Sequence, residues 1–177
     1  MTVKNTMDSL PWTKEAYSHL GIKEIKGPKH HPEITKMLKE LNLPWIDDET
    51  PWCAVFCSAV LKRSGRAYPK KTPAWARSFD NNGQKLTKPA FGCTATKSRK
   101  GGGGHVFFVV GKTTTGMIVG LGGNQSDMVN LALFNPREIT SYNWPPKEDG
   151  TIVSPAEHRY SLPVYDARTL KVSDKES

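Results

Sequence analysis

The sequence predicts an α+β fold, in which helices occupy the first half of the chain and strands the second. Up to Gly83, apolar side chains recur at intervals of three and four residues, as they do on one face of a helix. After Gly83, short β-branched and aromatic runs alternate with glycine-containing turns, which is typical of antiparallel strands joined by short connections. We therefore expect N-terminal helices, one of them central, packed on an antiparallel β-sheet.

Four segments of the first half have the start and stop signals of helices, with proline near the first turn and glycine or a polar turn at the end. The predicted helices are residues 8–21, 31–43, 50–65 and 71–83. The third contains the run "CAVFCSAVL", which is apolar on nearly every face. A helix of that kind is buried on most sides, so we expect it at the centre of the core.

Four strands are expected in the second half, and they end before a tail of different composition. The predicted strands are residues 105–111, 116–123, 128–134 and 138–144. From Pro145 onward the chain is rich in proline and charge and shows little periodicity. These boundaries divide the chain into a domain over 8–144 and an extension over 145–177 that wraps around it or is partly disordered.

The charge of the chain favours anionic partners. Twenty-five Lys and Arg against 17 Asp and Glu give 177 residues a formal charge of +8, which suits nucleic acid, anionic membranes or bacterial wall polymers. The densest basic cluster, residues 97–100, runs into four glycines and is expected to be a mobile loop. No element interleaves clustered Lys and Arg with aromatics, so we expect no nucleic-acid partner, although a non-catalytic basic module that binds nucleic acid or wall polymer stays an alternative.

No window of 18 apolar residues and no signal-peptide core occur in the sequence. We therefore expect no membrane span and synthesis in the cytoplasm. The number of cysteines, three, is odd, which argues against a disulfide framework and for reduced thiols.

Cys53 is the candidate nucleophile because of its place in the third helix. Thr50 is a good N-cap and Pro51 suits the first helical position, which predicts Cys53 as the third residue of the first turn. The unpaired amides and the positive dipole end of that turn stabilise a thiolate. The alternative is a space-filling role, which fits Cys57 one turn later. A catalytic role for Cys53 is favoured only if the chain also supplies a base.

His105 is the candidate base, since it alone of the five histidines opens a predicted strand. A catalytic imidazole also needs an acceptor that holds its second nitrogen. The next strand ends in "GGNQSD", which favours Asn124 as this acceptor, with Gln125 and Asp127 as rivals. The same residues are also ordinary turn formers, so a plain turn is the alternative.

Three stretches together resemble a known family. "DDETPWCAVFCSAVLKRSG", "GGHVFFVVG" and "LGGNQSDMVN", in this order, are similar to the phage and bacterial cysteine peptidases of the CHAP and NlpC type, which are papain-like and cut peptidoglycan. The resemblance covers roughly residues 8–144. It implies a papain-like fold, with Cys53 as nucleophile, His105 as base and Asn124 as the polar third residue.

The function expected from the resemblance is hydrolysis of an amide bond in the bacterial cell wall, as in a phage endolysin that a holin releases. An antibacterial amidase effector delivered by a secretion machine is the alternative. The substrate contacts are expected at Trp52, Trp75, Asp48 and Gln125. We expect a monomer that needs no cofactor or metal.

A zinc site is the competing chemistry for the same thiols. Three cysteines and one histidine satisfy tetrahedral zinc. The candidate ligands are Cys53, Cys57, Cys93 and His105. The sequence has no Cys-x-x-Cys pair, so we favour the hydrolase.

Overall fold

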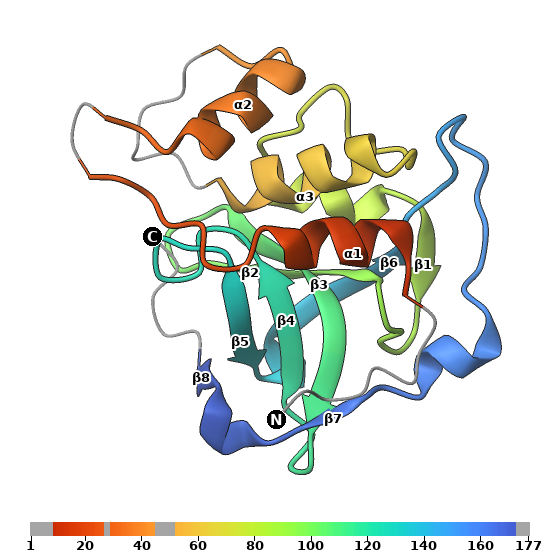
Figure 1. Cartoon of the computed structure of the whole chain (residues 1–177). Helices are drawn as coiled ribbons and strands as arrows, with labels where there is room; N and C mark the ends of the chain where they lie inside the picture. Colours follow the sequence, from red (N-terminus) through yellow and green to blue (C-terminus); the bar gives the residue numbers. More distant parts are fainter. Residues whose placement is uncertain (1–8, 27–28, 45–51, 173–177) are drawn as a thin grey trace.

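The structure is a computed structural model, which describes residues 9–26, 29–44 and 52–172. Its helical part consists of α1 (Pro11–Ser18), α2 (Pro32–Glu40), α3 (Cys53–Arg63) and the 3₁₀ helix η1 (Ala76–Asn81). Three shorter 3₁₀ turns follow: η2 (Pro136–Glu138), η3 (Glu157–Tyr160) and η4 (Ala167–Thr169). Figure 1 shows the three α-helices stacked on one side of a sheet, with α3 lying between α2 and the strands.

The described strands form one mostly antiparallel sheet. They are β1 (Gln84–Leu86), β2 (Thr94–Ser98), β3 (Gly104–Thr113), β4 (Ile118–Gly122), β5 (Asn130–Phe134), β6 (Ile139–Trp144), β7 (Val164–Tyr165) and β8 (Lys171–Val172). Their order is β1-β6-β2-β3-β4-β5-β8, and the short β7 pairs with β3. Only the pairs β3–β7 and β5–β8 are parallel among the described strands. The predicted α+β class is confirmed.

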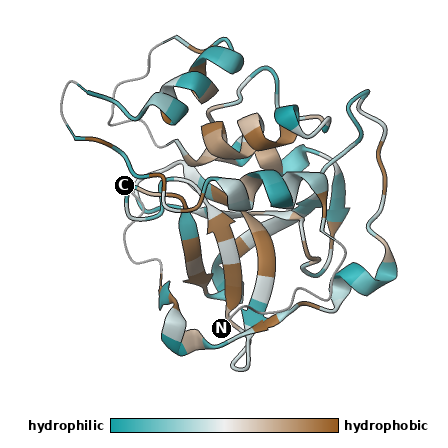
Figure 2. Ribbon diagram, in the orientation of Figure 1, coloured by the Kyte–Doolittle hydropathy of each residue, from teal (hydrophilic) through white to brown (hydrophobic). Residues whose placement is uncertain are grey.

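Helix α3 is the centre of the core. Each residue from Cys53 to Leu61 is buried, because the sheet covers one side of the helix and α1 and α2 cover the others. Figure 2 shows the same apolar character in α3, β3 and β4. Burying a side chain such as Val60 or Leu61 stabilises the fold by about 1.5–3 kcal/mol. The start of α3 is thereby held on a rigid support.

Strand β2 corrects the first half of the predicted basic loop, residues 97 and 98, whereas Arg99 and Lys100 do lie in the turn that leads into the glycines. Lys97 lies in this strand opposite His105, and its ammonium group is 5.7 Å from the ring centroid of Phe134. The side chain of Lys97 is only 14% exposed and lies 3.4 Å from a carboxylate oxygen of Glu138. The run "TATKS" lacks apolar alternation, so its strand character was not visible in the sequence. It becomes a strand because β3 and β6 pair with it on both sides.

The predicted fourth helix, residues 71–83, is shorter than expected, and only the 3₁₀ helix η1 forms within it.

The segment after Pro145 runs along the sheet and adds β7 and β8 to it (Figure 1). Its contacts reach back to the first helix, since the hydroxyls of Tyr17 and Tyr165 lie 2.9 Å apart. The backbone N–H of Phe91 also donates to the carbonyl of Arg159 at 2.7 Å.

Across the described ranges, every helix is too short or too polar to cross a lipid bilayer.

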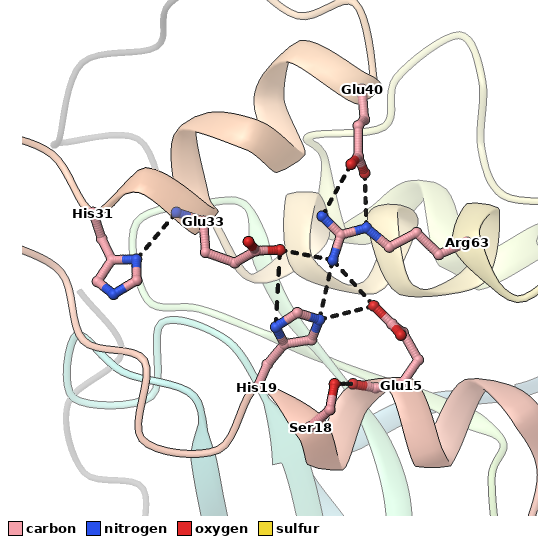
Figure 3. Close-up of polar contacts among 7 residues, drawn as sticks. All are labelled: Glu15, Ser18, His19, His31, Glu33, Glu40 and Arg63. Carbon is pink, nitrogen blue, oxygen red and sulfur yellow. Dashed lines mark hydrogen bonds and ion pairs between the residues drawn. The ribbon is translucent and has the colours of Figure 1, made fainter.

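One arginine joins the three helices. Arg63 of α3 makes ion pairs with Glu15 of α1 at 3.0 Å and with Glu33 and Glu40 of α2 at 2.8 Å each (Figure 3). His19 lies in the same cluster, with Nε2 2.8 Å from Glu15 Oε1. Burial raises the pKa of Glu15, but hydrogen bonds from His19 and Arg63 outweigh it and hold this pKa below its ordinary value. The cluster fixes α1 and α2 against α3.

Candidate active site

Cys53 is the first residue of α3, rather than the third as predicted. The helix begins one position after Trp52, whose carbonyl accepts a hydrogen bond from the N–H of Phe56 at 2.9 Å. The predicted cap Thr50 and the predicted first residue Pro51 lie outside the described residues. Cys53 still lies in the first turn of the helix, where the backbone amides have no acceptor within the helix and can stabilise a thiolate.

The surroundings of Cys53 favour its thiolate. Burial raises the pKa of Cys53, but the charge of His105 and a hydrogen bond with this imidazole lower it, helped by the N–H of Val106 and the charge of Arg99. The result is a pKa below the ordinary value of 9.0, although the residue is only 1% exposed. A buried thiol ionises in this way only where charges and donors are aimed at it.

The other two cysteines show the opposite behaviour. Burial raises the pKa of Cys57 well above its usual range, and the nearby Cys53 adds to this. Burial raises the pKa of Cys93 to about 12. The thiol of Cys57 donates to the carbonyl of Val106 at 3.8 Å, so it packs as an ordinary core thiol. Cys53 alone of the three cysteines is prepared to ionise.

The zinc alternative is wrong for the described residues. Cys53, Cys57, Cys93 and His105 all lie within them, yet no three His, Cys, Asp or Glu side chains in the described ranges are grouped as metal ligands. The sequence allowed the site because two thiols one helical turn apart share a face. The fold does not gather the other ligands around that face.

His105 is the second residue of β3 and is completely buried. Its ring stacks on Phe107 and Phe134, with centroid distances of 5.8 Å and 5.6 Å. Directly before it, Gly104 leaves room for Arg77, because a Cβ on this glycine would lie 2.8 Å from Cδ of the arginine. The imidazole is therefore held by packing as well as by hydrogen bonds.

Gln125 holds the outer nitrogen of this imidazole. Oε1 of Gln125 lies 3.0 Å from Nε2 of His105. The NH₂ group of the same side chain donates to the backbone oxygen and to Oδ1 of Asn130, at 2.9 Å each. Because these acceptors require the NH₂ end, the carbonyl end faces the ring, and Nε2 of His105 must carry the proton. Since Nε2 is engaged by Gln125, Nδ1 is the nitrogen left for the hydrogen bond of His105 with Cys53.

This contact favours Gln125, one of the two rivals, over Asn124 as the orienter. The prediction was Asn124, with Gln125 and Asp127 as rivals, and the structure gives the hydrogen bond to Gln125. Asn124, Ser126 and Asp127 all have left-handed backbones, with φ of 56°, 55° and 62°. These turns direct the side chain of Gln125 back beneath β3. Spacing along the sequence placed the right loop beside His105, but it could not decide which side chain points inward.

Two glycines before Gln125 allow this arrangement, and they are a signal that the sequence prediction did not use. A Cβ on Gly122 would lie 2.4 Å from Oε1 of Gln125. A Cβ on Gly123 would lie 2.7 Å from Cβ of Phe56 and 2.7 Å from the ring of Trp52. Both approaches are closer than real Cβ contacts, so the pair of glycines lets the loop reach the imidazole and the helix start together.

The predicted substrate contacts separate into different environments. Trp52 is 5% exposed, and its indole N–H donates to Glu24 at 3.1 Å, so it is a packing residue rather than a cleft wall. Gln125 is buried and orients His105 instead of meeting substrate. Trp75, directly before η1, is 57% exposed and remains available to a ligand. Asp48 lies outside the described residues.

The dyad itself is enclosed, since Cys53, His105 and Gln125 all have almost no exposed surface. Entry of a substrate therefore requires neighbouring groups to move. The arrangement combines a thiol of lowered pKa, an imidazole beside it, and the first amides of a helix, which suit a developing oxyanion.

Comparison of the chain with protein-family models, with curated proteins and with solved structures finds no match. The geometry of Cys53, His105 and Gln125 is therefore the basis for inferring what the protein does.

Proposed function

We propose that this protein is a cysteine hydrolase that cleaves an amide bond by acyl transfer. The observation that carries the proposal is the hydrogen bond and charge of His105 at the first residue of α3, which hold the pKa of Cys53 below its ordinary value although burial raises it. His105 supplies the opposing charge, and Oε1 of Gln125 accepts the Nε2 proton of its ring, which leaves Nδ1 for proton exchange with the sulfur. Structural packing has no need of a buried thiolate, whereas nucleophilic catalysis does.

In the proposed reaction, the thiolate of Cys53 attacks the amide carbonyl carbon, and the backbone N–H of Cys53 stabilises the oxyanion. The imidazolium of His105 gives its Nδ1 proton to the leaving nitrogen as the C–N bond breaks, which leaves a thioester on the sulfur. His105 then takes a proton from water, and the hydroxide attacks the thioester. Cleavage of the C–S bond releases the acid and returns the thiolate.

We infer bacterial peptidoglycan as the substrate class and a papain-like arrangement for the fold. The support is the resemblance of the stretches around Cys53, His105 and Asn124 to wall-cutting cysteine peptidases, together with the charge of +8, which suits an anionic wall. A phage lysin released by a holin and an effector delivered by a secretion machine both fit these features.

The test is digestion of purified wall sacculi, followed by mass spectrometry of the soluble fragments. We expect the native protein to release fragments with new amino and carboxyl ends, and Cys53→Ala to release none. Cys57→Ala is the matched control, because this cysteine lies in the same helix and has a raised pKa. Binding to sacculi without cleavage, or equal digestion by Cys53→Ala, would contradict the proposal.

A further inference from the structure

Asn130, the first residue of β5, makes three hydrogen bonds with Gln125. Oδ1 and the backbone oxygen of Asn130 accept from Nε2 of Gln125 at 2.9 Å each. In the other direction, Nδ2 of Asn130 donates to the backbone oxygen of Gln125 at 2.8 Å. Asn130 is therefore hydrogen-bonded to both the main chain and the side chain of Gln125, the residue that contacts His105.

The loop that carries Gln125 has a strained backbone and depends on hydrogen bonds of this kind to hold its conformation. Three of its non-glycine residues, Asn124, Ser126 and Asp127, have positive φ, which L-residues adopt only at a cost. Two backbone bonds also hold it, from Gln125 N–H to Met128 and from Glu24 N–H to Asp127, at 3.0 Å and 2.8 Å. Neither of these bonds determines which end of the Gln125 amide faces the ring. The backbone oxygens of Gly120, at 3.4 Å, and of Asn130 accept from its Nε2, and the side chain of Asn130 adds the third acceptor.

We propose that Asn130 is a positioning residue for the Cys53–His105 pair, because it fixes the amide of Gln125 with its oxygen toward the imidazole. With this oxygen in place, the proton of His105 stays on Nε2 and Nδ1 faces the sulfur. If the amide rotates by half a turn, an N–H meets an N–H, and the ring has to change its tautomer or move. The inference rests on the proposed function for its catalytic consequence only.

The test compares the native protein with Asn130→Ala, Gln125→Ala and the double variant. Nitrogen chemical shifts of the His105 ring report its tautomer, and ultraviolet absorbance of the thiolate reports ionisation of Cys53. Neither measurement uses a substrate, so failure of this inference is distinguishable from failure of wall hydrolysis. We expect Asn130→Ala to reduce protonation of Nε2, whether the ring is the neutral Nε2–H tautomer or the imidazolium, and to reduce the thiolate population at neutral pH about tenfold, the effect of losing one or two hydrogen bonds.

The double variant separates positioning from general stability. If Asn130 acts through Gln125, the double variant matches Gln125→Ala alone, so the two effects are not additive. Asn130→Asp retains an acceptor for Nε2 of Gln125, and we expect it to keep the native tautomer. Asn130→Leu keeps the volume without the polar groups and replaces the alanine variant if that one does not fold. Asn135→Ala is the control, since this exposed asparagine caps η2 instead.

Three results would overturn the inference. The first is an unchanged His105 tautomer in the folded alanine or leucine variant. The second is a loss in the double variant equal to the product of the two single losses. The third is a change in Asn130→Asp as large as that in Asn130→Leu.

Discussion

Replacement of His105 by glutamine tests the central electrostatic claim. The variant removes the charge beside Cys53 but keeps a polar side chain that can donate to Gln125. In the native protein, this imidazole outweighs burial and holds the pKa of Cys53 below 9.0. Cys93 shows what burial does in the same core, because its pKa is raised to about 12.

In His105→Gln, the pKa of Cys53 should lie between the ordinary thiol value of 9.0 and the value of about 12 that burial gives Cys93. Burial then dominates and raises it above 9.0, while the N–H of Val106 and the charge of Arg99 keep it below the value of Cys93. Each pH unit of this rise lowers the thiolate population at neutral pH tenfold and corresponds to about 1.4 kcal/mol. We expect a loss of about 10- to 1,000-fold, equivalent to about 1–4 kcal/mol.

The assay is a titration of thiolate absorbance from about pH 5 to about pH 10, with Cys53→Ala as the blank. In the native protein, the signal of Cys53 persists below pH 9 and disappears as the pH falls through the lowered pKa. In His105→Gln, the signal develops only at alkaline pH, and wall digestion at neutral pH falls with it. His158→Gln is the control, because this histidine is exposed on η3. If the folded His105→Gln protein keeps the native midpoint, His105 does not lower the pKa of Cys53.

Three further predictions concern the supports of the site. Gly122→Ala places a methyl group 2.4 Å from Oε1 of Gln125, so we expect loss of wall digestion and a destabilisation of about 1–3 kcal/mol in urea unfolding; native activity would contradict the close approach. Arg63→Ala leaves three carboxylates without their shared cation, and we expect it to lower the free energy of unfolding at pH 7 by about 3 kcal/mol. Because the pKa of Glu15 is lowered, the stabilisation from its ion pair is present above its ordinary pKa and is lost on acidification. The difference in free energy of unfolding between the native protein and Arg63→Ala should therefore shrink toward about pH 3. A difference that is constant with pH would count against the ion-pair cluster. Trp52→Phe removes the bond to Glu24 and should cost about 1 kcal/mol in the same unfolding measurement, with an unchanged stability as the contrary result.

Parts of the fold that depend on local pattern were predictable. The apolar run of α3 and the four β-branched segments that became β3, β4, β5 and β6 are visible in the sequence. Strand β2 was not predicted, because its polar residues become a strand only through pairing with β3 and β6. Trp52 was predicted to meet substrate, since a tryptophan beside a nucleophile looks the same in a cleft and in a core. Its burial depends on Gly123, which is distant in sequence.

The two candidate groups of the proposed site, Cys53 and His105, are recognisable from local sequence alone. A cysteine beside a proline-initiated helix and a histidine at the start of a strand are local features, and helix ends and strand starts form from near neighbours. Only the tertiary structure decided how these groups are oriented. The backbone turns at Asn124, Ser126 and Asp127 select Gln125 as the partner of His105, and Asn130 sets the direction of its amide. Such choices depend on the directions of side chains from separate strands, and these directions exist only once the strands are packed together.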